Sequence, residues 1–307
     1  YEFGFDKLDR WIDMCRRCGI KYFEMSHLFT QWGAEHAPKI IAEVDGEKKR
    51  IFGWETDADS EEYRDFLHRF AAALTAFIDR KGIRNFCCFH VSDEPSLEQY
   101  EVYKKRADLI AEIFPGFKVI DALSDIEFFD KGAVKYPIPS EDHVEDFVGK
   151  VDEFWTYYCC GQHNKNVPNR FFAMPSARNR ILGTLLYKYN ATGFLQWGYN
   201  YWYSQFSKHE IDPFTVTDAG KAFPSGDAFV VYPGEDGQPI NSLRFKVFYD
   251  GLQDLAAMRL LESLVGREKA LEIAIQDDEL TFQKYPHGSS YLLALRERVN
   301  KAIKENI

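Results

Sequence analysis

The stretch from Phe86 to Ser96 constrains the fold more than any other, because an apolar run is followed there by two adjacent acidic residues and a proline. The apolar run indicates a buried strand, and Pro95 favours extended backbone at Glu94 over helix. Gln99 lies three residues after Ser96, which is the spacing of a capping box at the start of a helix. The order of strand, acidic pair and helix is typical of parallel α/β sheets and barrels, whose active sites lie at the carboxyl ends of the strands.

The two acidic residues, Asp93 and Glu94, can share a pocket only if the strand has ended, because successive strand side chains point to opposite faces. Most glycosidases place two carboxylates about 5 Å or more apart across the scissile bond. Adjacent carboxylates suit substrate-assisted hydrolysis, in which the 2-acetamido oxygen of the sugar attacks the anomeric carbon. Asp93 would then hold the amide N–H, and Glu94 would serve as acid and base. In the alternative interpretation, the pair only complements the dipole of the helix that follows.

Size and composition narrow the classes of protein and of partner. The 307 residues suit one large α/β domain or two smaller ones, with 45% apolar and 28% charged residues. A net charge of −10 argues against nucleic acid or an anionic membrane as the main partner. No apolar run reaches the length of about 18 residues that a membrane span needs. Aromatic residues at 16% fit either a thick core or a cleft lined with flat rings, as sugar-binding sites often are.

The start of the chain and its cysteines bear on the native compartment. The sequence shows no signal peptide but begins with Tyr1, so we expect a fragment or a processed product. Reduced core cysteines are expected, which mildly favours an intracellular protein. A zinc site at the single C-x-x-C is weakly supported, and we expect no metal and no cofactor. The six cysteines fall into three close pairs, Cys15 and Cys18, Cys87 and Cys88, and Cys159 and Cys160.

The pattern of apolar residues predicts strands and helices in alternation. Helices are expected over 5–18, 59–80, 97–114 and 176–189, and strands over 20–27, 83–91, 117–123, 153–160, 193–199 and within 224–234. Asp45-Gly46 predicts a hairpin inside a long excursion over 28–56, which carries Trp32 and Trp54. We therefore predict one domain, with a (β/α)8 TIM-type barrel over about 1–235 that lacks its first strand or strands, and a helical C-terminal section over about 236–307.

Further side chains that suit sugar binding follow the predicted strands. Each one alone is explained more simply by core packing or by a loop hydrogen bond, so their joint placement is the argument. His90 lies within its strand and is expected to be a satisfied interior histidine, and a metal site made from it, His27 and the acidic pair has no ligand motif in its favour. The residues at or just after strand ends are His27, Asp125, Tyr157, Tyr158, Trp197, Asn200, Tyr201 and Trp202.

A set of segments in fixed order resembles one known family, the catalytic domain of glycoside hydrolase family 123. The segments are Ser-Asp-Glu-Pro at 92–95, Trp-Thr-Tyr-Tyr-Cys-Cys at 155–160, Gly-Phe-Leu-Gln-Trp-Gly-Tyr-Asn at 193–200, Pro-Ser-Gly-Asp at 224–227 with Tyr-Pro-Gly at 232–234, and Ser-Leu-Arg at 242–244 with Asp-Gly-Leu-Gln-Asp at 250–254. The resemblance implies a (β/α)8-type barrel and an exo-acting, retaining β-N-acetylgalactosaminidase that uses substrate assistance. The catalytic Asp-Glu pair of the family corresponds to Asp93 and Glu94. The usual N-terminal β-sandwich of the family is absent from this chain.

Two other functions stay open at this stage. One is a barrel that binds carbohydrate without catalysis, which explains the aromatic residues equally well. The other is a glycosidase with a protein nucleophile, in which Glu94 pairs with Asp125 or another acid. The sequence indicates neither the oligomeric state nor whether the 28–56 excursion closes over a substrate.

Overall fold

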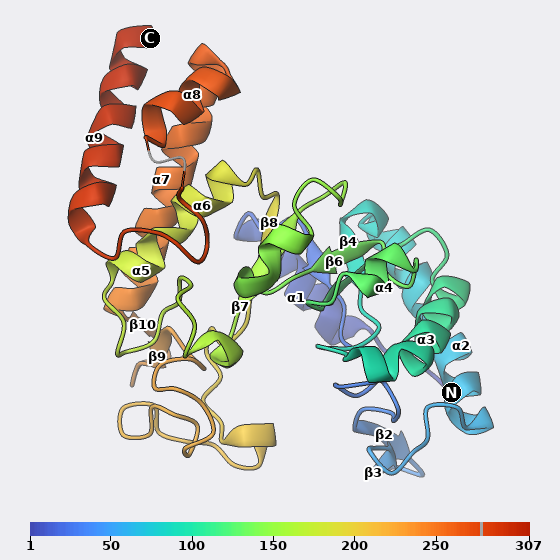
Figure 1. Ribbon diagram of the computed structural model, residues 1–307. Coiled ribbons are helices and arrows are strands. Elements are labelled where there is room, and N and C mark those ends of the chain that lie inside the picture. Colours follow the sequence, from blue (N-terminus) through green and yellow to red (C-terminus); the bar gives the residue numbers. More distant parts are fainter. Residues whose placement is uncertain (277–278) are drawn as a thin grey trace. The chain divides into compact units, whose positions relative to one another are not determined.

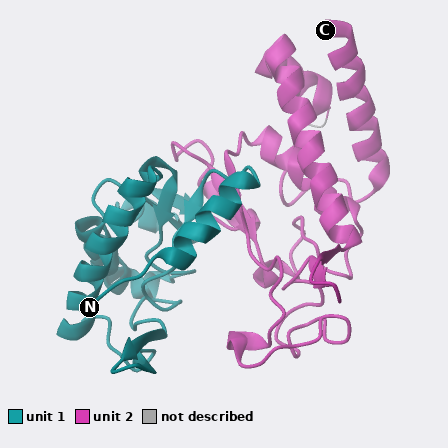
Figure 2. Ribbon diagram, turned by 180° about the vertical axis from the view of Figure 1, so that it is seen from behind, with its two compact units in different colours: residues 1–138 teal, residues 139–307 magenta. Residues whose placement is uncertain are grey.

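The computed structural model describes residues 1–276 and 279–307 and divides the chain into two units, Tyr1–Ile138 and Pro139–Ile307 (Figure 2). The single domain expected from the sequence stays a prediction. The chain has a mixed α/β fold with a helical C-terminal region, as the sequence predicts.

Unit 1 is built on a four-stranded parallel sheet in the order β1-β4-β5-β6. Helices link the strands, as parallel neighbours require, so the predicted β-α-β alternation is confirmed in this unit (Figure 1). The strands are β1 (Phe23–Glu24), β4 (Cys87–Phe89), β5 (Lys118–Ala122) and β6 (Tyr136–Ile138), and the helices are α1 (Asp6–Arg17), α2 (Glu61–Lys81), α3 (Tyr100–Ile113) and α4 (Glu127–Asp130).

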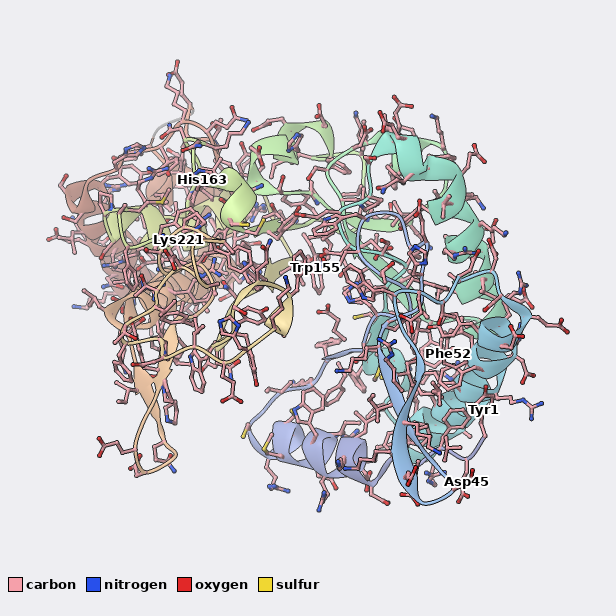
Figure 3. The ribbon with its side chains drawn as sticks, turned by 90° about the horizontal axis from the view of Figure 1, so that it is seen from below. Tyr1, Asp45, Phe52, Trp155, His163 and Lys221 are labelled. Atoms are coloured by element: carbon pink, nitrogen blue, oxygen red, sulfur yellow. The ribbon has the colours of Figure 1, made fainter. Side chains whose placement is uncertain are left out.

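Helix α2 forms where its apolar stripe predicts, and both of its ends have a clear cause. The Ser60 hydroxyl accepts a hydrogen bond from the Tyr63 N–H at the start, and Gly82 takes a left-handed conformation at the end. The ring of Phe66 lies 5.2 Å from the rings of both Tyr1 and Phe52, which are labelled in Figure 3. Aromatic packing therefore holds the first residues and the hairpin against this helix.

The predicted hairpin is present in the excursion, with β2 (Ile40–Val44) and β3 (Glu47–Phe52) paired antiparallel. Asp45 and Gly46 have φ values of 56° and 79°, which is the pair of left-handed residues that a two-residue type I′ turn needs. Figure 3 shows Asp45 at the hairpin tip.

The strand before the acidic pair is shorter than predicted. Residues 84–86 form a 3-10 turn, and strand pairing is confined to β4. The ladder ends because the Asp121 carboxylate accepts the Val91 N–H at 3.0 Å and the Ser92 N–H at 3.3 Å. The capping box of Ser96 and Gln99 is confirmed, and it opens a 3-10 turn that leads into α3.

Unit 2 contains a parallel pair of strands followed by helices. The pair β7–β8 matches two of the predicted strands, whereas the hairpin β9–β10 adds one strand that the sequence analysis missed. Because these two strand pairs and the sheet of unit 1 are separate sheets, the strand order does not establish a closed barrel. The strands are β7 (Trp155–Tyr158), β8 (Gly193–Gln196), β9 (Val231–Pro233) and β10 (Pro239–Asn241), and the short helices between β7 and β8 are α5 (Ala177–Arg180) and α6 (Leu182–Lys188).

The helical C-terminal section is confirmed, with α7 (Leu243–Val265), α8 (Arg267–Ala274) and α9 (Ser289–Asn306) (Figure 1). Asp254 on α7 is fully buried and binds Arg180 of α5 at 2.7 Å and Arg296 of α9 at 2.9 Å. A Cβ atom on Gly183 of α6 would lie 1.8 Å from the Gly251 carbonyl oxygen. Small residues therefore let α6 and α7 approach closely, and one carboxylate ties three helices together.

The cysteines depart in part from the expectation of a reduced core set. All six are free thiols, but only Cys15 and Cys87 are buried and Cys18 is exposed. The other three are half-buried, so the expected core position is wrong for four of the six: Cys18 follows the end of α1, Cys88 lies in the short strand β4, and Cys159 and Cys160 lie in the turn after β7. None of the described helices combines the length and the hydropathy that crossing a membrane requires.

Candidate functional site

The acidic pair sits on a turn that is held from both sides. The Asp93 carbonyl accepts the Trp32 N–H at 3.0 Å, and the Glu94 N–H donates to the Ala122 carbonyl at 2.9 Å. Glu94 has a φ of 47°, so the extended backbone expected from Pro95 is wrong. The two long-range hydrogen bonds overrule the local preference. A non-glycine residue held in this conformation is a feature that concentrates at functional sites.

The 28–56 excursion is fastened to this turn. The Ser92 hydroxyl donates to the Thr30 carbonyl at 3.3 Å, and the Gln99 side chain donates to the Trp32 carbonyl. The Trp32 N–H is therefore hydrogen-bonded to Asp93, and the Trp32 carbonyl to Gln99. Trp32 is nevertheless 49% exposed. Trp54, on the same excursion, is similarly exposed.

A buried histidine lies between two carboxylates behind the turn. His90 is 3% exposed, with Nε2 2.6 Å from Glu24 Oε1 and Nδ1 3.6 Å from Asp121 Oδ1. Asp121 is fully buried and also accepts a hydrogen bond from the Tyr103 hydroxyl. The ring of His27 lies 4.5 Å from that of His90. His90 is thus an interior histidine, as expected, with carboxylates from β1 and β5 beside its ring, but within the described part of the chain no well-formed hydrogen bond satisfies its Nε2.

The pKa values of Asp93 and His90 are raised and that of His27 is lowered, because their neighbours differ. Burial and the charges of Glu94 and Asp121 raise the pKa of Asp93 to about 6. Burial opposes charge on His90, but the carboxylates of Asp121 and Glu24 raise its pKa to about 9. Desolvation and the charge of His90 lower the pKa of His27 to about 4. At neutral pH the cluster thus holds an imidazolium at His90, a neutral His27 and an ionised Asp93.

The predicted residues in unit 1 separate into two groups. His27 lies beside His90, whereas Asp93 and Glu94 share the turn that follows His90. Asp125 instead accepts the Glu127 N–H at 3.0 Å and so begins the short helix α4. This hydrogen bond gives Asp125 a structural role and does not support it as a nucleophile.

The predicted residues in unit 2 lie around a buried arginine. Tyr157 and Tyr158 are buried, and the guanidinium carbon of Arg170 lies 4.9 Å from the centre of the Tyr158 ring. The Trp197 indole N–H donates to Asp227 at 3.1 Å, and the Trp197 ring lies 5.5 Å from that of Tyr201. Burial of the two tyrosines favours core packing over sugar contact.

The remaining two predicted residues, Asn200 and Trp202, take part in loop structure. Asn200 forms an isolated antiparallel bridge with Phe229. The Trp202 indole N–H donates to the Val231 carbonyl at 3.0 Å. Asn200 is nevertheless exposed and Trp202 is half-buried.

The sequence analysis missed Glu24, Tyr103 and Asp121 in unit 1, and Arg170 and Asp227 in unit 2. A carboxylate inside the apolar run 119–122 was the available signal for Asp121, since a buried charge needs partners. No such signal marks Glu24 or Tyr103, because only strand pairing and helix packing bring them to this cluster. Among the described residues, no group of three or more His, Cys, Asp or Glu side chains is arranged to hold a metal ion.

Comparisons with known proteins agree on one family. The model for the glycoside hydrolase 123 catalytic domain matches residues 1–261. A solved structure of a family 123 glycoside hydrolase from Clostridium perfringens, studied for glycolipid glycan hydrolysis, has a TM-score of 0.65 at 16% sequence identity. The match covers 99% of this chain and 55% of that chain, so this chain spans about half the length of that relative. The comparison with curated proteins gives no significant match.

Proposed function

The chain belongs to glycoside hydrolase family 123, and on this premise we propose that it hydrolyses terminal N-acetyl-β-hexosaminides, with N-acetylgalactosamine as the favoured sugar. The reaction would retain configuration through substrate assistance, with Asp93 and Glu94 as the catalytic residues. The observation that carries the proposal is the acidic pair on a turn fixed by hydrogen bonds to the Trp32 N–H and the Ala122 carbonyl. Such fixed geometry is what catalysis by orientation requires.

In the first step, the carbonyl oxygen of the 2-acetamido group attacks the anomeric carbon. Glu94, which is exposed, donates its proton to the leaving glycosidic oxygen as that bond breaks. Asp93 accepts a hydrogen bond from the acetamido N–H and balances the positive charge that develops on the oxazolinium ion. Its pKa of about 6 leaves Asp93 ionised at neutral pH, as this role requires.

In the second step, Glu94 takes a proton from water, and the resulting hydroxide attacks the anomeric carbon. The bond to the acetamido oxygen breaks, and the amide is restored. Two displacements at the same carbon return it to its starting configuration, and Glu94 ends the cycle protonated again.

The remaining elements of the proposal concern fold and binding. A (β/α)8-type barrel is part of it, supported by the parallel neighbours β4, β5 and β6 in unit 1 and by β7 and β8 in unit 2. Carbohydrate is the proposed partner. Tyr157 and Tyr158 are buried, and Asp125 caps a helix, so we leave these three out of the proposed sugar contacts. The predicted residues that remain are exposed or half-buried, namely His27, Trp197, Asn200, Tyr201 and Trp202.

The test uses two aryl substrates that differ only in the 2-substituent, N-acetyl-β-galactosaminide and the corresponding galactoside. Turnover of the first alone is the expected result, because the second lacks the acetamido nucleophile. Turnover of both would point to a protein nucleophile. Binding of N-acetylgalactosamine without turnover of either would point to a carbohydrate-binding function.

Two substitutions assign the roles and a third serves as the control. Glu94→Gln and Asp93→Asn should each lower kcat by about 1,000-fold or more, because each removes a group that acts on the reacting atoms. Asp125→Asn should retain most of the activity, since the amide oxygen can still accept the Glu127 N–H. Undiminished turnover in both Asp93 and Glu94 variants would sink the proposal.

A further inference from the structure

The cluster behind the acidic turn has a use beyond packing. His90 is separated from Asp93 by two residues, Val91 and Ser92, whose N–H groups both donate to the Asp121 carboxylate. The same carboxylate lies 3.6 Å from His90 Nδ1. One buried acid therefore holds both the histidine and the backbone that leads to the catalytic pair.

The other side of the imidazole is held as well. Glu24 approaches Nε2 to 2.6 Å from strand β1, whose neighbour in the sheet is β4. A carboxylate therefore lies close to each ring nitrogen, and two neighbouring negative charges favour the protonated, positively charged form of the ring. Its position is fixed by two strands and is independent of any bound substrate.

We propose that His90 is a positioning residue for the reaction: its imidazolium, clamped between Glu24 and Asp121, sets a permanent positive charge beside Asp93. This inference rests on the proposed function, since it assigns the charge a task in that site. His90 would not touch the substrate. It would favour the ionised form of Asp93 that the oxazolinium step needs.

The charges that face this position come from several elements. Glu24 on β1, Asp121 on β5, and Glu94 beside it all act on Asp93 as like charges that oppose its ionisation, and His90 alone among these named groups favours it. Tyr103 from α3 contributes a hydroxyl that donates to Asp121, and His27 is neutral above its pKa of about 4. Removing His90 should therefore leave Asp93 harder to ionise, whereas removing the Glu24 charge should make it easier.

The measurement is the acidic limb of the kcat/KM profile against pH, for three variants with the aryl N-acetyl-β-galactosaminide. His90→Gln should move this limb upward by about one pH unit or more, and Glu24→Gln should move it downward. In Glu24→Gln the histidine is still held by Asp121. The control is His68→Gln, because His68 also faces a carboxylate, Glu112, at 3.7 Å but lies at the surface between α2 and α3. That variant should leave the limb in place.

A second readout does not depend on turnover. The carboxyl carbon of Asp93 in protein labelled with 13C-aspartate can be titrated by NMR, with its signal assigned by its loss in Asp93→Asn. Opposite displacements of this titration in His90→Gln and Glu24→Gln support the proposal even if no substrate is cleaved, in which case only the proposed function fails. Displacements in the same direction, or none, overturn the positioning role. Should His90→Gln not fold, as judged by circular dichroism, His90→Asn takes its place, and the absence of an upward displacement of the Asp93 titration in that variant would overturn the positioning role.

Discussion

Asp93 in unit 1 and Asp227 in unit 2 are two carboxyl groups with the same raised pKa, about 6, and opposite surroundings. Burial is the main cause in both. Around Asp93 the next causes are the anions Glu94 and Asp121, which raise the pKa further. Around Asp227 they are Arg170 and the Trp197 indole, which lower it. A perturbed carboxyl group is therefore not by itself a sign of catalysis, and the charge of its neighbours separates the two cases.

The hydrogen bonds show what each buried charge does. Arg170 lies 3.8 Å from the Asp227 carboxylate, but its Nη2 donates to the carbonyls of Trp197 and of Asp227 itself. This arginine ties loop backbones together. The Asp121 carboxylate in unit 1 also accepts hydrogen bonds from backbone N–H groups, but these belong to Val91 and Ser92, which directly precede the acidic pair. Arg170 and Asp227 therefore have a structural role, whereas Asp121 supports the acidic pair to which the proposed function assigns the reaction.

The largest expected effect comes from neutralising one acid in each cluster. Glu94→Gln should lower kcat by about 1,000-fold or more, whereas Asp227→Asn should lower it less than about tenfold. The asparagine oxygen can still accept from the Trp197 indole. Steady-state kinetics with the aryl N-acetyl-β-galactosaminide measures both. A loss at Asp227 as large as that at Glu94 would remove the distinction.

The structural role of the unit 2 cluster predicts a large loss of stability. Arg170→Met removes the buried partner of Asp227 and the donor to two carbonyls, so the free energy of unfolding should fall by about 3–5 kcal/mol. Urea unfolding followed by circular dichroism gives this value. Lys269→Met, which breaks the exposed pair with Glu272, is the control and should change stability by less than about 1 kcal/mol. A similar effect of the two variants would contradict the role of Arg170.

Ionisation of Asp93 in unit 1 should lower the free energy of unfolding. The pKa of Asp93 is about 6 in the fold and 3.8 in the reference state, so the fold binds the proton more tightly and loses stability as pH rises from about 4 to 6. Asp93→Asn should therefore be more stable than the parent protein well above pH 6, by about 3 kcal/mol at most, and gain little below pH 4. Thermal unfolding across this range checks the sign. A gain that is independent of pH would mean that the charge is not its cause.

The smallest effect concerns the two exposed tryptophans of the excursion. Trp32 is bound through its backbone to the acidic turn, and Trp54 lies further along the same excursion, after the hairpin strand β3. Trp32→Ala should raise KM for an N-acetylgalactosamine disaccharide about fivefold, equivalent to about 1 kcal/mol of ring contact. Trp54→Ala should stay within about twofold. Equal effects would show that the excursion acts as a whole.

Much of the fold was predictable because its signals are local. The Asp45-Gly46 turn, the Ser60 cap and the capping box at Ser96 each depend on residues within one turn of the chain, and all three are present. The strand β10 was missed because its three residues are all exposed and show no alternation of buried and exposed positions.

The site was predictable only in part, because its support comes from distant residues. The acidic pair stood out in the sequence, but the left-handed backbone of Glu94 depends on Trp32 and Ala122. Glu24 reaches His90 because it pairs with Cys88 across two parallel strands. A short stretch of sequence does not show which residues of two distant strands pair. The residues that surround His90 are therefore known only from the structure.

The bond from Asp121 to the Val91 N–H spans 30 residues of sequence, and it has a consequence for the order of folding. The acidic turn cannot take its final shape until β5 has docked beside β4, and closing that loop is a slow, entropically costly event. We expect the turn to mature late, together with the sheet rather than ahead of it. Amide hydrogen exchange at Val91 and Ser92 should then proceed only through global unfolding of unit 1. A newly made chain would thus form its acidic turn only after its core is complete.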